Sequence, residues 1–424
     1  MSSLSIESLL ADLRPRLKNH FDQTLLIPSD QIPLSAPTTG IDELEAVLKC
    51  FLEQRLTMGN KVSEFEKSFA KYIGRRHAIM VNSGSSANLL MIEALCNPKT
   101  AVNLRLKDGD EVLVPTVTWS TTITPVIGAR LVPVLVDAEL HTLNMSVSAA
   151  KAAIGPKTKA IFVAHILGNS ADMSGLMTLA KEHNLILLED SCEALGTKYN
   201  GQQTGSFGLA ASYSFYFSHH ITTIEGGMIV TDDDEYADLM RCLRAHGWTR
   251  HMHAKDKFEK ENSHLDPRFL FVNTGFNVRS TDVNAAIGLQ QLKKLDAFNK
   301  ARVKIAVQMR KALSPWDNNF IWIEPTKGAD HTWFGFPFLM DGAVKNKRTE
   351  FMQHLADWNI ETRPIVAGNL AEQPFLKLFP HRVGGPLPAA QEIMRRGVYW
   401  GSHPQMNQEH IQHLAKAVES FFKK

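Results

Sequence analysis

Cysteine is scarce in this chain of 424 residues, and the four that occur are Cys50, Cys96, Cys192 and Cys242. They lie far apart, and no two are separated by only one or two residues. Iron–sulfur and zinc sites are usually built from closely spaced cysteine pairs, and small secreted folds depend on disulfide frameworks. The spacing therefore argues against both, and we expect four reduced thiols and no metal site.

The chain also lacks an excess of charge and a long apolar run. Its 46 Lys and Arg residues nearly balance its 44 Asp and Glu residues, so the formal net charge is +2. This balance gives no reason to expect nucleic acid or an anionic membrane as a partner. No apolar run approaches the ~20 residues that span a bilayer, and the N-terminal stretch has no signal-peptide core. We expect a cytoplasmic protein.

What the sequence does contain is a regular alternation of short apolar runs with helical stretches. The runs are AIMV, EVLVP, LVPVLVD, AIFVAHI, LILLED, SYSFYF and GMIVTD. Runs of this length, bounded by turn residues, are typical of buried and mostly parallel strands in a doubly wound α/β domain. We predict an N-terminal arm over residues 1–35, a large α/β domain over 36–294 and a smaller α+β domain over 295–424.

One of these runs continues into a stretch without lysine, SFYFSHHITTIEGGM, residues 214–228. The pattern predicts a strand that places Phe215 and Phe217 on the same face, because side chains alternate along a strand. Two adjacent histidines, His219 and His220, follow it and precede a double-glycine turn.

Small or polar residues follow other predicted strands, at the carboxyl ends where open parallel sheets bind ligands. Gly84 and Ser85 precede a helix that we expect to start near Ala87, and such a turn suits a phosphate, although helix capping alone explains it. Trp119 follows the next strand, with core packing as its alternative role. Asp190 ends a further strand and needs a cationic or hydrogen-bonding partner, or serves as a helix cap.

These features occur in the order of a known family. The motifs NSGSSAN, VPTVTW, EDSCEALG, SFYFSHHITTIEGG and FNVRSTDVNAAIGLQQL resemble those of the DegT/DnrJ/EryC1/StrS sugar aminotransferases, from about residue 36 onward. The resemblance implies an α/β fold of pyridoxal-phosphate-dependent transferases of fold type I. In that family the position five residues after Ser214 and six before Glu225 carries the lysine that binds the cofactor covalently. Here that position is His219.

Histidine has no primary amine, so it cannot take over the covalent bond, but it can still move protons. A double histidine before EGG resembles one subgroup, the nucleoside-diphosphate 4-keto-6-deoxyhexose 3-dehydratases. The resemblance implies a lyase that uses the cofactor as pyridoxamine 5'-phosphate. His219 would be the catalytic acid and base while the C3 hydroxyl of the sugar leaves, and the product would be a dideoxysugar for a surface polysaccharide such as a lipopolysaccharide O-antigen.

The resemblance also assigns roles to other residues. Asp190 would pair with the pyridine nitrogen, Trp119 would stack on the ring, Glu193 would lie near the 3-oxygen, and Ser218 would contact the substrate. The residues implied for the phosphate are Gly84, Ser85, Ser214 and, from a neighbouring subunit, Asn277. A homodimer with shared active sites is therefore expected.

Two types of enzyme occur within the subgroup. One carries a [2Fe–2S] cluster whose cysteines include a CxC after a WGR-like segment, whereas HGWTRHMHAKDKFEK has no cysteine there. The other type recharges its cofactor with L-glutamate, bound by two arginines that Arg250 and Arg279 match. The resemblance to this second type implies GDP-4-keto-6-deoxy-D-mannose as the nucleotide-sugar substrate and no iron–sulfur cluster.

Three different functions stay open beside this one. The chain could be a CDP-4-keto-6-deoxyglucose 3-dehydratase, a pyridoxal-phosphate-dependent sugar aminotransferase, or a non-catalytic relative that binds the cofactor. The missing lysine speaks against the aminotransferase. The presence of Asp190, Arg250 and Arg279 speaks against a non-catalytic relative.

Overall fold

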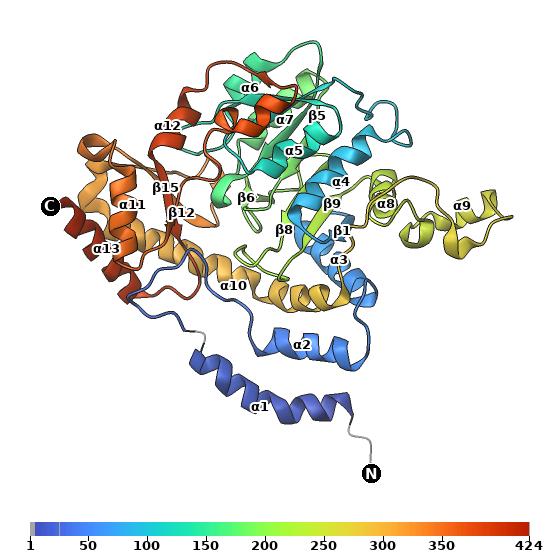
Figure 1. Ribbon diagram of the computed structural model, residues 1–424, viewed down its shortest axis with the longest axis horizontal. Coiled ribbons are helices and arrows are strands. Elements are labelled where there is room, and N and C mark those ends of the chain that lie inside the picture. The colour runs from blue at the N-terminus through green and yellow to red at the C-terminus, as the bar shows by residue number, and fades with distance from the viewer. Residues whose placement is uncertain (1–4, 25, 424) are drawn as a thin grey trace.

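The computed structural model describes residues 5–24 and 26–423, and its centre is an eight-stranded sheet (Figure 1). The strand order is β1-β9-β8-β5-β4-β2-β3-β14. The strands are β1 (His77–Val81), β2 (Glu111–Pro115), β3 (Val132–Val136), β4 (Thr158–Ala164), β5 (Ile186–Asp190), β8 (Ala210–Ser214), β9 (Gly227–Thr231) and β14 (Arg382–Val383). Neighbouring strands from β8 to β14 are parallel, and β9 is antiparallel to β1 and β8. This topology confirms the α/β fold class.

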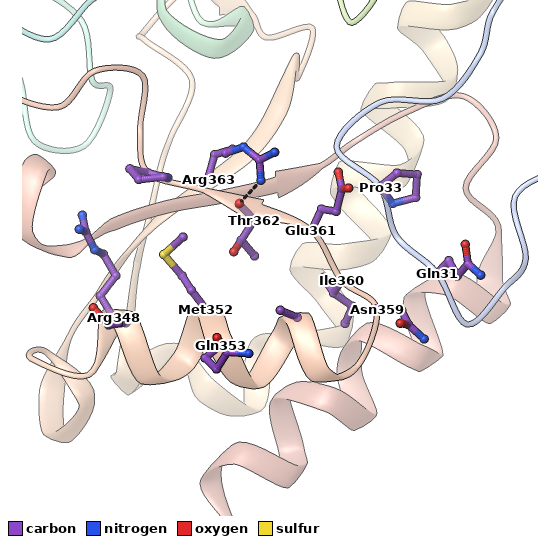
Figure 2. Close-up of a pocket in the computed structure, with 13 residues that line it drawn as sticks. Gln31, Pro33, Arg348, Met352, Gln353, Asn359, Ile360, Glu361, Thr362 and Arg363 are labelled. Atoms are coloured by element: carbon purple, nitrogen blue, oxygen red, sulfur yellow. Dashed lines mark hydrogen bonds between the residues drawn. The ribbon is translucent and has the colours of Figure 1, made fainter.

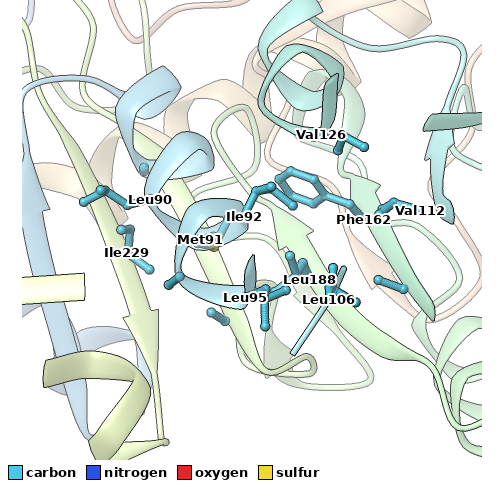
Figure 3. Packing of buried hydrophobic residues seen from close by; sticks show 14 of the residues in the cluster. Leu90, Met91, Ile92, Leu95, Leu106, Val112, Val126, Phe162, Leu188 and Ile229 are labelled. Carbon is cyan, nitrogen blue, oxygen red and sulfur yellow. The ribbon is translucent and has the colours of Figure 1, made fainter. Parts of the chain in front are cut away.

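Helices cover both faces of this sheet. They are α3 (Asn60–Ile73), α4 (Gly84–Cys96), α5 (Ser120–Gly128), α6 (Val147–Ala153), α7 (Met173–Glu182), α8 (Asp234–Leu243) and α10 (Asp282–Ala312). Along β1, Ile79 and Val81 pack with α4, whereas Ala78 and Met80 pack with α3 and α10. Figure 3 shows the first of these cores, in which α4 meets the sheet. The near-continuous apolar runs are therefore explained by strands that bury both faces.

A smaller antiparallel sheet holds the C-terminal part of the chain. Its order is β10 (Phe320–Trp322), β12 (Gly335–Met340), β15 (Gly397–Gly401) and β13 (Thr362–Arg363), with α11 (Arg348–Asp357), α12 (Pro388–Arg396) and α13 (Gln408–Phe422) around it. Helix α10 packs on α3 and also on α13. Because α10 continues through position 294, the predicted division between two domains at that point stays a prediction.

The N-terminal segment lies along this framework. Helix α1 (Ile6–Thr24) contacts α2 (Ile41–Leu52), which packs on α10 (Figure 1). Helix α9 (Lys255–Glu261) projects at the right edge of the view. A search of residues 5–24 and 26–423 finds no helix long and apolar enough to cross a membrane.

The chain after β8 does not follow the prediction. β8 ends at Ser214, and the backbone N–H of Phe215 donates to the carbonyl of Gly226, which folds residues 215–226 into a loop. Phe215 is fully buried, with its ring centroid 5.4 Å from that of Phe65, whereas Phe217 is 45% exposed. The prediction that Phe215 and Phe217 share a face was wrong, because strand alternation stops where the chain turns.

A second irregular feature is the segment of residues 331–334, which joins β11 (Ala329–Asp330) to β12 and which we call the crossing segment. The backbone N–H of Thr332 donates to the carbonyl of Gly168 at 3.0 Å, and that of Phe334 donates to the carbonyl of Leu167 at 3.0 Å. The chain that follows β4 and the chain that enters the small sheet are thus held against each other at the carboxyl edge of the central sheet.

Candidate active site

A cavity of about 390 Å³ opens at the carboxyl end of the central sheet. A volume of this size is in the range of small-molecule sites. The predicted site residues that line it are Gly84, Ser85, Trp119, Asp190, Glu193, Ser214, Ser218 and His219. A larger cavity of about 770 Å³ lies between α11 and β13 (Figure 2), and none of the predicted site residues lines it.

One wall of the smaller cavity is the first turn of α4, which begins at Gly84 and not near Ala87 as predicted. The hydroxyl of Ser83 caps this helix, so the helix starts as soon as a capping oxygen is available. The backbone N–H groups of Gly84 and Ser85 lie in the first turn, where a helix offers no partner. A Cβ on Gly84 would lie 2.7 Å from the Cβ of Ser214, so only glycine fits. The turn suits a phosphate.

The floor of the cavity is the carboxylate of Asp190 at the end of β5. One carboxylate oxygen accepts hydrogen bonds from Asn88 Nδ2 at 2.8 Å and Thr122 Oγ1 at 2.9 Å. The other accepts from the backbone N–H of Cys192 at 3.2 Å. These donors hold the buried carboxylate in one orientation, where it can pair with a protonated ring nitrogen.

Sequence reasoning missed Asn88 and Thr122. Asn88 follows Gly84 by four residues, about one helical turn, and Thr122 follows Trp119 by three. Helical spacing from two residues already considered was therefore the signal that could have found them.

Trp119 and Glu193 border the same space. Trp119 is 58% exposed, which excludes core packing as its role. A carboxylate oxygen of Glu193 accepts from the backbone N–H of Leu167 at 2.8 Å. Burial, with a smaller contribution from the charge of Asp190, raises the pKa of Glu193 to about 7. Glu193 can therefore carry a proton near neutral pH and donate it to an oxygen in the cavity.

His219 lines another wall of the cavity, in the loop after β8. Its ring centroid lies 5.1 Å from that of Phe334 in an edge-on contact, and its Nδ1 atom is buried without a hydrogen-bond partner. Burial lowers the pKa of His219 to about 4, and the nearby guanidinium of Arg302 contributes in the same direction. At neutral pH the imidazole is therefore uncharged and able to accept a proton.

The contacts of Arg302 explain why its guanidinium lies near His219. This residue of α10 is buried, and it donates to the carbonyl of Phe334 at 3.1 Å and to the carbonyl of Ser402. No carboxylate pairs with it among the described ion pairs, and burial lowers its pKa to about 10. A cation beside an imidazole disfavours the imidazolium form.

Three predicted residues lie outside the cavity: Arg250, Asn277 and Arg279. Arg279 Nε donates to Asn277 Oδ1 at 2.9 Å, and the guanidinium of Arg250 lies over the ring of Trp248 at 4.9 Å. Burial, followed by the charges of Arg244, Arg250 and Arg279, lowers the pKa of His251 to about 4. In a single chain none of the three predicted residues lines the cavity.

The cysteines do not come together in the structure. All four are free, and the sulfur of Cys192 lies 3.8 Å from Ser212 Oγ. Within the part of the chain that the structure describes, no group of three or more His, Cys, Asp or Glu side chains could hold a metal ion.

Comparison with known proteins identifies the family. Residues 37–419 match the DegT/DnrJ/EryC1/StrS aminotransferase family. This chain belongs to that family. A GDP-4-keto-6-deoxy-D-mannose 3-dehydratase of Yersinia pseudotuberculosis is 39% identical over 386 residues, which cover 90% of this chain and 96% of that protein. The family predicted from the motifs is confirmed.

Two solved structures of family members resemble this chain over nearly its whole length. The E. coli GDP-4-keto-6-deoxy-D-mannose-3-dehydratase with bound hydrated pyridoxal phosphate has a TM-score of 0.84 and 36% identity, covering 91% of this chain and 99% of that one. A GDP-4-keto-6-deoxymannose-3-dehydratase with a trapped adduct of pyridoxal phosphate and glutamate has a TM-score of 0.83 and 35% identity, covering 91% and 100%. Both confirm the predicted fold.

Proposed function

We propose that this chain is a pyridoxamine-phosphate-dependent 3-dehydratase of GDP-4-keto-6-deoxy-D-mannose, with L-glutamate recharging the cofactor. The observation that carries the proposal is His219, which lines the same cavity as Asp190 and stands at the position where family members carry a lysine. An imidazole can move protons there but cannot bind the cofactor covalently. The named relatives support this function over an aminotransferase or a non-catalytic role.

The residues of the cavity fit the cofactor. The first turn of α4 and the hydroxyl of Ser214 would hold its phosphate, Asp190 would pair with its ring nitrogen, and Trp119 would stack on the ring. Glu193, carrying a proton, would donate to the ring 3-oxygen. When bound, the cofactor supplies an amine for the sugar ketone and an electron sink for the bonds that break.

His219 would perform the acid–base chemistry. The uncharged imidazole accepts a proton from the carbon next to the cofactor ring, and the resulting imidazolium donates a proton to the departing C3 hydroxyl. Burial and the charge of Arg302 make the imidazolium unfavourable, so it gives its proton up readily. Phe334 and Tyr216, which both contact the His219 ring, reduce the access of water to it.

We further propose a homodimer in which the partner supplies Asn277 and the pair Arg250 and Arg279 to this cavity. In one chain these three residues lie outside the cavity. Large apolar side chains near them are exposed, including Phe269 at 67% and Phe271 at 53%. Since exposed apolar side chains in a group are typical of an interaction surface, a second copy of the chain would cover them. We also propose that the protein is cytoplasmic, as expected from the sequence.

The test is to incubate the purified protein with GDP-4-keto-6-deoxy-D-mannose, pyridoxal phosphate and glutamate, and to analyse all products. Loss of the C3 oxygen from the sugar, with equal amounts of 2-oxoglutarate and ammonia, is expected, because glutamate then supplies the electrons and its nitrogen leaves as ammonia. A sugar that keeps its C3 hydroxyl and gains an amine would identify an aminotransferase.

The same assay distinguishes the dehydratase types and a protein without activity. Faster turnover of CDP-4-keto-6-deoxyglucose than of the GDP sugar would reassign the nucleotide. Cofactor binding without turnover of either sugar or glutamate would identify a non-catalytic relative. Dependence on added reductase, with iron and sulfide bound in stoichiometric amounts, would assign the cluster-containing type.

A further inference from the structure

His220, the second histidine of the pair, is buried with only 1% of its surface exposed, and it does not line the cavity. Its Nε2 atom lies 3.0 Å from Thr332 Oγ1 in the crossing segment. Its Nδ1 atom is buried and has no hydrogen-bond partner among the described residues. A buried polar side chain with a single partner depends strongly on that partner, since an unmade hydrogen bond in the interior is costly.

The direction of this hydrogen bond follows from counting protons. Thr197 Oγ1 donates to the carbonyl of Gly168 at 2.8 Å and lies 2.7 Å from Thr332 Oγ1. Thr332 Oγ1 also lies 3.4 Å from the carbonyl oxygen of Gly168, so the single proton of Thr332 is used on Thr197 or on Gly168, and its oxygen can accept from His220 in either case. A proton on Nδ1 of His220 would be buried without an acceptor. The imidazole is therefore uncharged, with its proton on Nε2, and donates to Thr332.

These hydrogen bonds connect His220 to the segment that contacts His219. Phe334 follows Thr332 by two residues, and its ring centroid lies 5.1 Å from that of His219 and 5.7 Å from that of His220. The backbone of the crossing segment is itself held by the carbonyls of Leu167 and Gly168. The loop that carries His219 is thus fastened to a segment far away in the sequence, and Phe334 is the surface against which the His219 ring rests.

We propose that His220 is a positioning residue, whose Nε2–H bond to Thr332 holds the His219 loop against Phe334 and so sets the direction of the His219 ring. The inference rests on the proposed function, because it assigns a purpose to the position of His219. It depends on the relay from His220 through Thr332 and Thr197 to Gly168, four residues that do not line the cavity.

The test compares variants that break the relay with variants that keep it. Thr332→Val and His220→Phe remove the hydroxyl or the donor with little change of volume, whereas Thr332→Ser and His220→Gln retain them. Thr231→Val is the matched control, because the Thr231 hydroxyl is also buried and donates to the carbonyl of Leu209 at 2.7 Å, but at the opposite end of β9. Thermal unfolding shows which variants fold.

In folded protein, both relay-breaking variants are expected to slow the sugar and the glutamate half-reactions alike, by about tenfold or more, because His219 moves the proton in both. The deuterium isotope effect with glutamate labelled at C2 should rise, since proton transfer becomes slower relative to other steps. Thr332→Ser, His220→Gln and Thr231→Val should keep near-normal rates. A folded Thr332→Val protein with unchanged rates and an unchanged isotope effect would overturn the proposal.

A second readout needs no activity. In protein without cofactor and labelled with ¹⁵N-histidine, NMR should show His220 with its proton on Nε2, and this state should be lost in Thr332→Val but kept in Thr332→Ser. A proton on Nδ1 in the wild-type protein would overturn the proposal. A wild-type protein that converts no sugar but shows the expected NMR state would contradict the proposed function and leave the relay established.

Discussion

Two parts of the cavity, the floor at Asp190 and the wall at His219, are held in different ways. On the floor, Asp190 accepts hydrogen bonds from Asn88, Thr122 and the backbone of Cys192. On the wall, His219 has an unpartnered Nδ1 and rests against an aromatic ring from the crossing segment. The floor thus offers a fixed negative charge that can bind a protonated ring nitrogen, whereas the wall carries an imidazole whose protonation can change. Binding and proton transfer are therefore assigned to separate parts of one cavity.

The largest effect is expected from a substitution that removes the proton-accepting group of the wall and leaves the floor unchanged. His219→Asn removes the group that accepts the proton, so both half-reactions should fall by roughly 10²–10⁴-fold. Cofactor affinity, measured by fluorescence titration, should stay close to that of the wild type, because Asp190 and its donors are untouched. Loss of cofactor binding in this variant would show that wall and floor are not separate.

His219→Lys provides a second test at the same position. Borohydride should fix no cofactor to the native protein, because imidazole forms no covalent bond with it, whereas the lysine variant should be labelled. Mass spectrometry of the peptide that contains residue 219 gives the answer. Labelling of the native chain at another lysine would contradict the role assigned to His219.

A substitution on the floor should weaken cofactor binding. Asp190→Asn removes the carboxylate that pairs with the ring nitrogen, and losing one partner of a shielded charged pair costs roughly 2–5 kcal/mol. Cofactor affinity should therefore fall by about 30-fold or more, in contrast to His219→Asn. Equilibrium titration measures it, and an affinity equal to that of the wild type would remove Asp190 from the binding role.

Arg250→Ala and Arg279→Ala test the group that lies outside the cavity in one chain. A guanidinium fork suits a carboxylate, so each loss should slow the glutamate half-reaction by about 30-fold. A single turnover of sugar by enzyme preloaded with pyridoxamine phosphate should change much less. If both half-reactions fall equally, or if glutamate turnover is unaffected, these arginines do not bind glutamate.

The smallest expected effect is on stability and concerns Glu193. Its pKa in the folded protein is about 7, against an ordinary value of 4.5, so between these pH values the folded state keeps a proton that the unfolded chain has lost. Stability therefore falls as pH rises through this window, by up to roughly 3 kcal/mol. Glutamine does not titrate, so Glu193→Gln should raise the Tm of the cofactor-free protein at pH 8 and change it little at pH 5.

Calorimetry at the two pH values provides the comparison. His219 acts in the opposite sense, because its folded pKa of about 4 lies below its ordinary value of 6.5. Its burial therefore costs stability as pH falls from 6.5 towards 4. An equal change of Tm at pH 5 and pH 8 in Glu193→Gln would show that the carboxyl is not held protonated.

Much of the cavity lining could be predicted from the sequence. Gly84, Trp119 and Asp190 each follow an apolar run, and parallel strands bring their carboxyl ends to one edge, so a local pattern was enough to group them. The prediction was wrong where the alternation of a strand ended. Phe215 and Phe217 were placed on one face because alternation was extended beyond Ser214, the residue at which β8 ends.

The strands, the family and the replacement of the lysine by His219 could be read from residue types at short, fixed spacings. The surroundings of that histidine became known only from the packing of the chain. Phe334, Thr332 and Arg302 come from segments distant in the chain, and Arg250 and Arg279 lie outside the cavity of their own chain. Contacts between distant segments leave no periodic trace in the sequence, since they are set by how whole elements pack and cross.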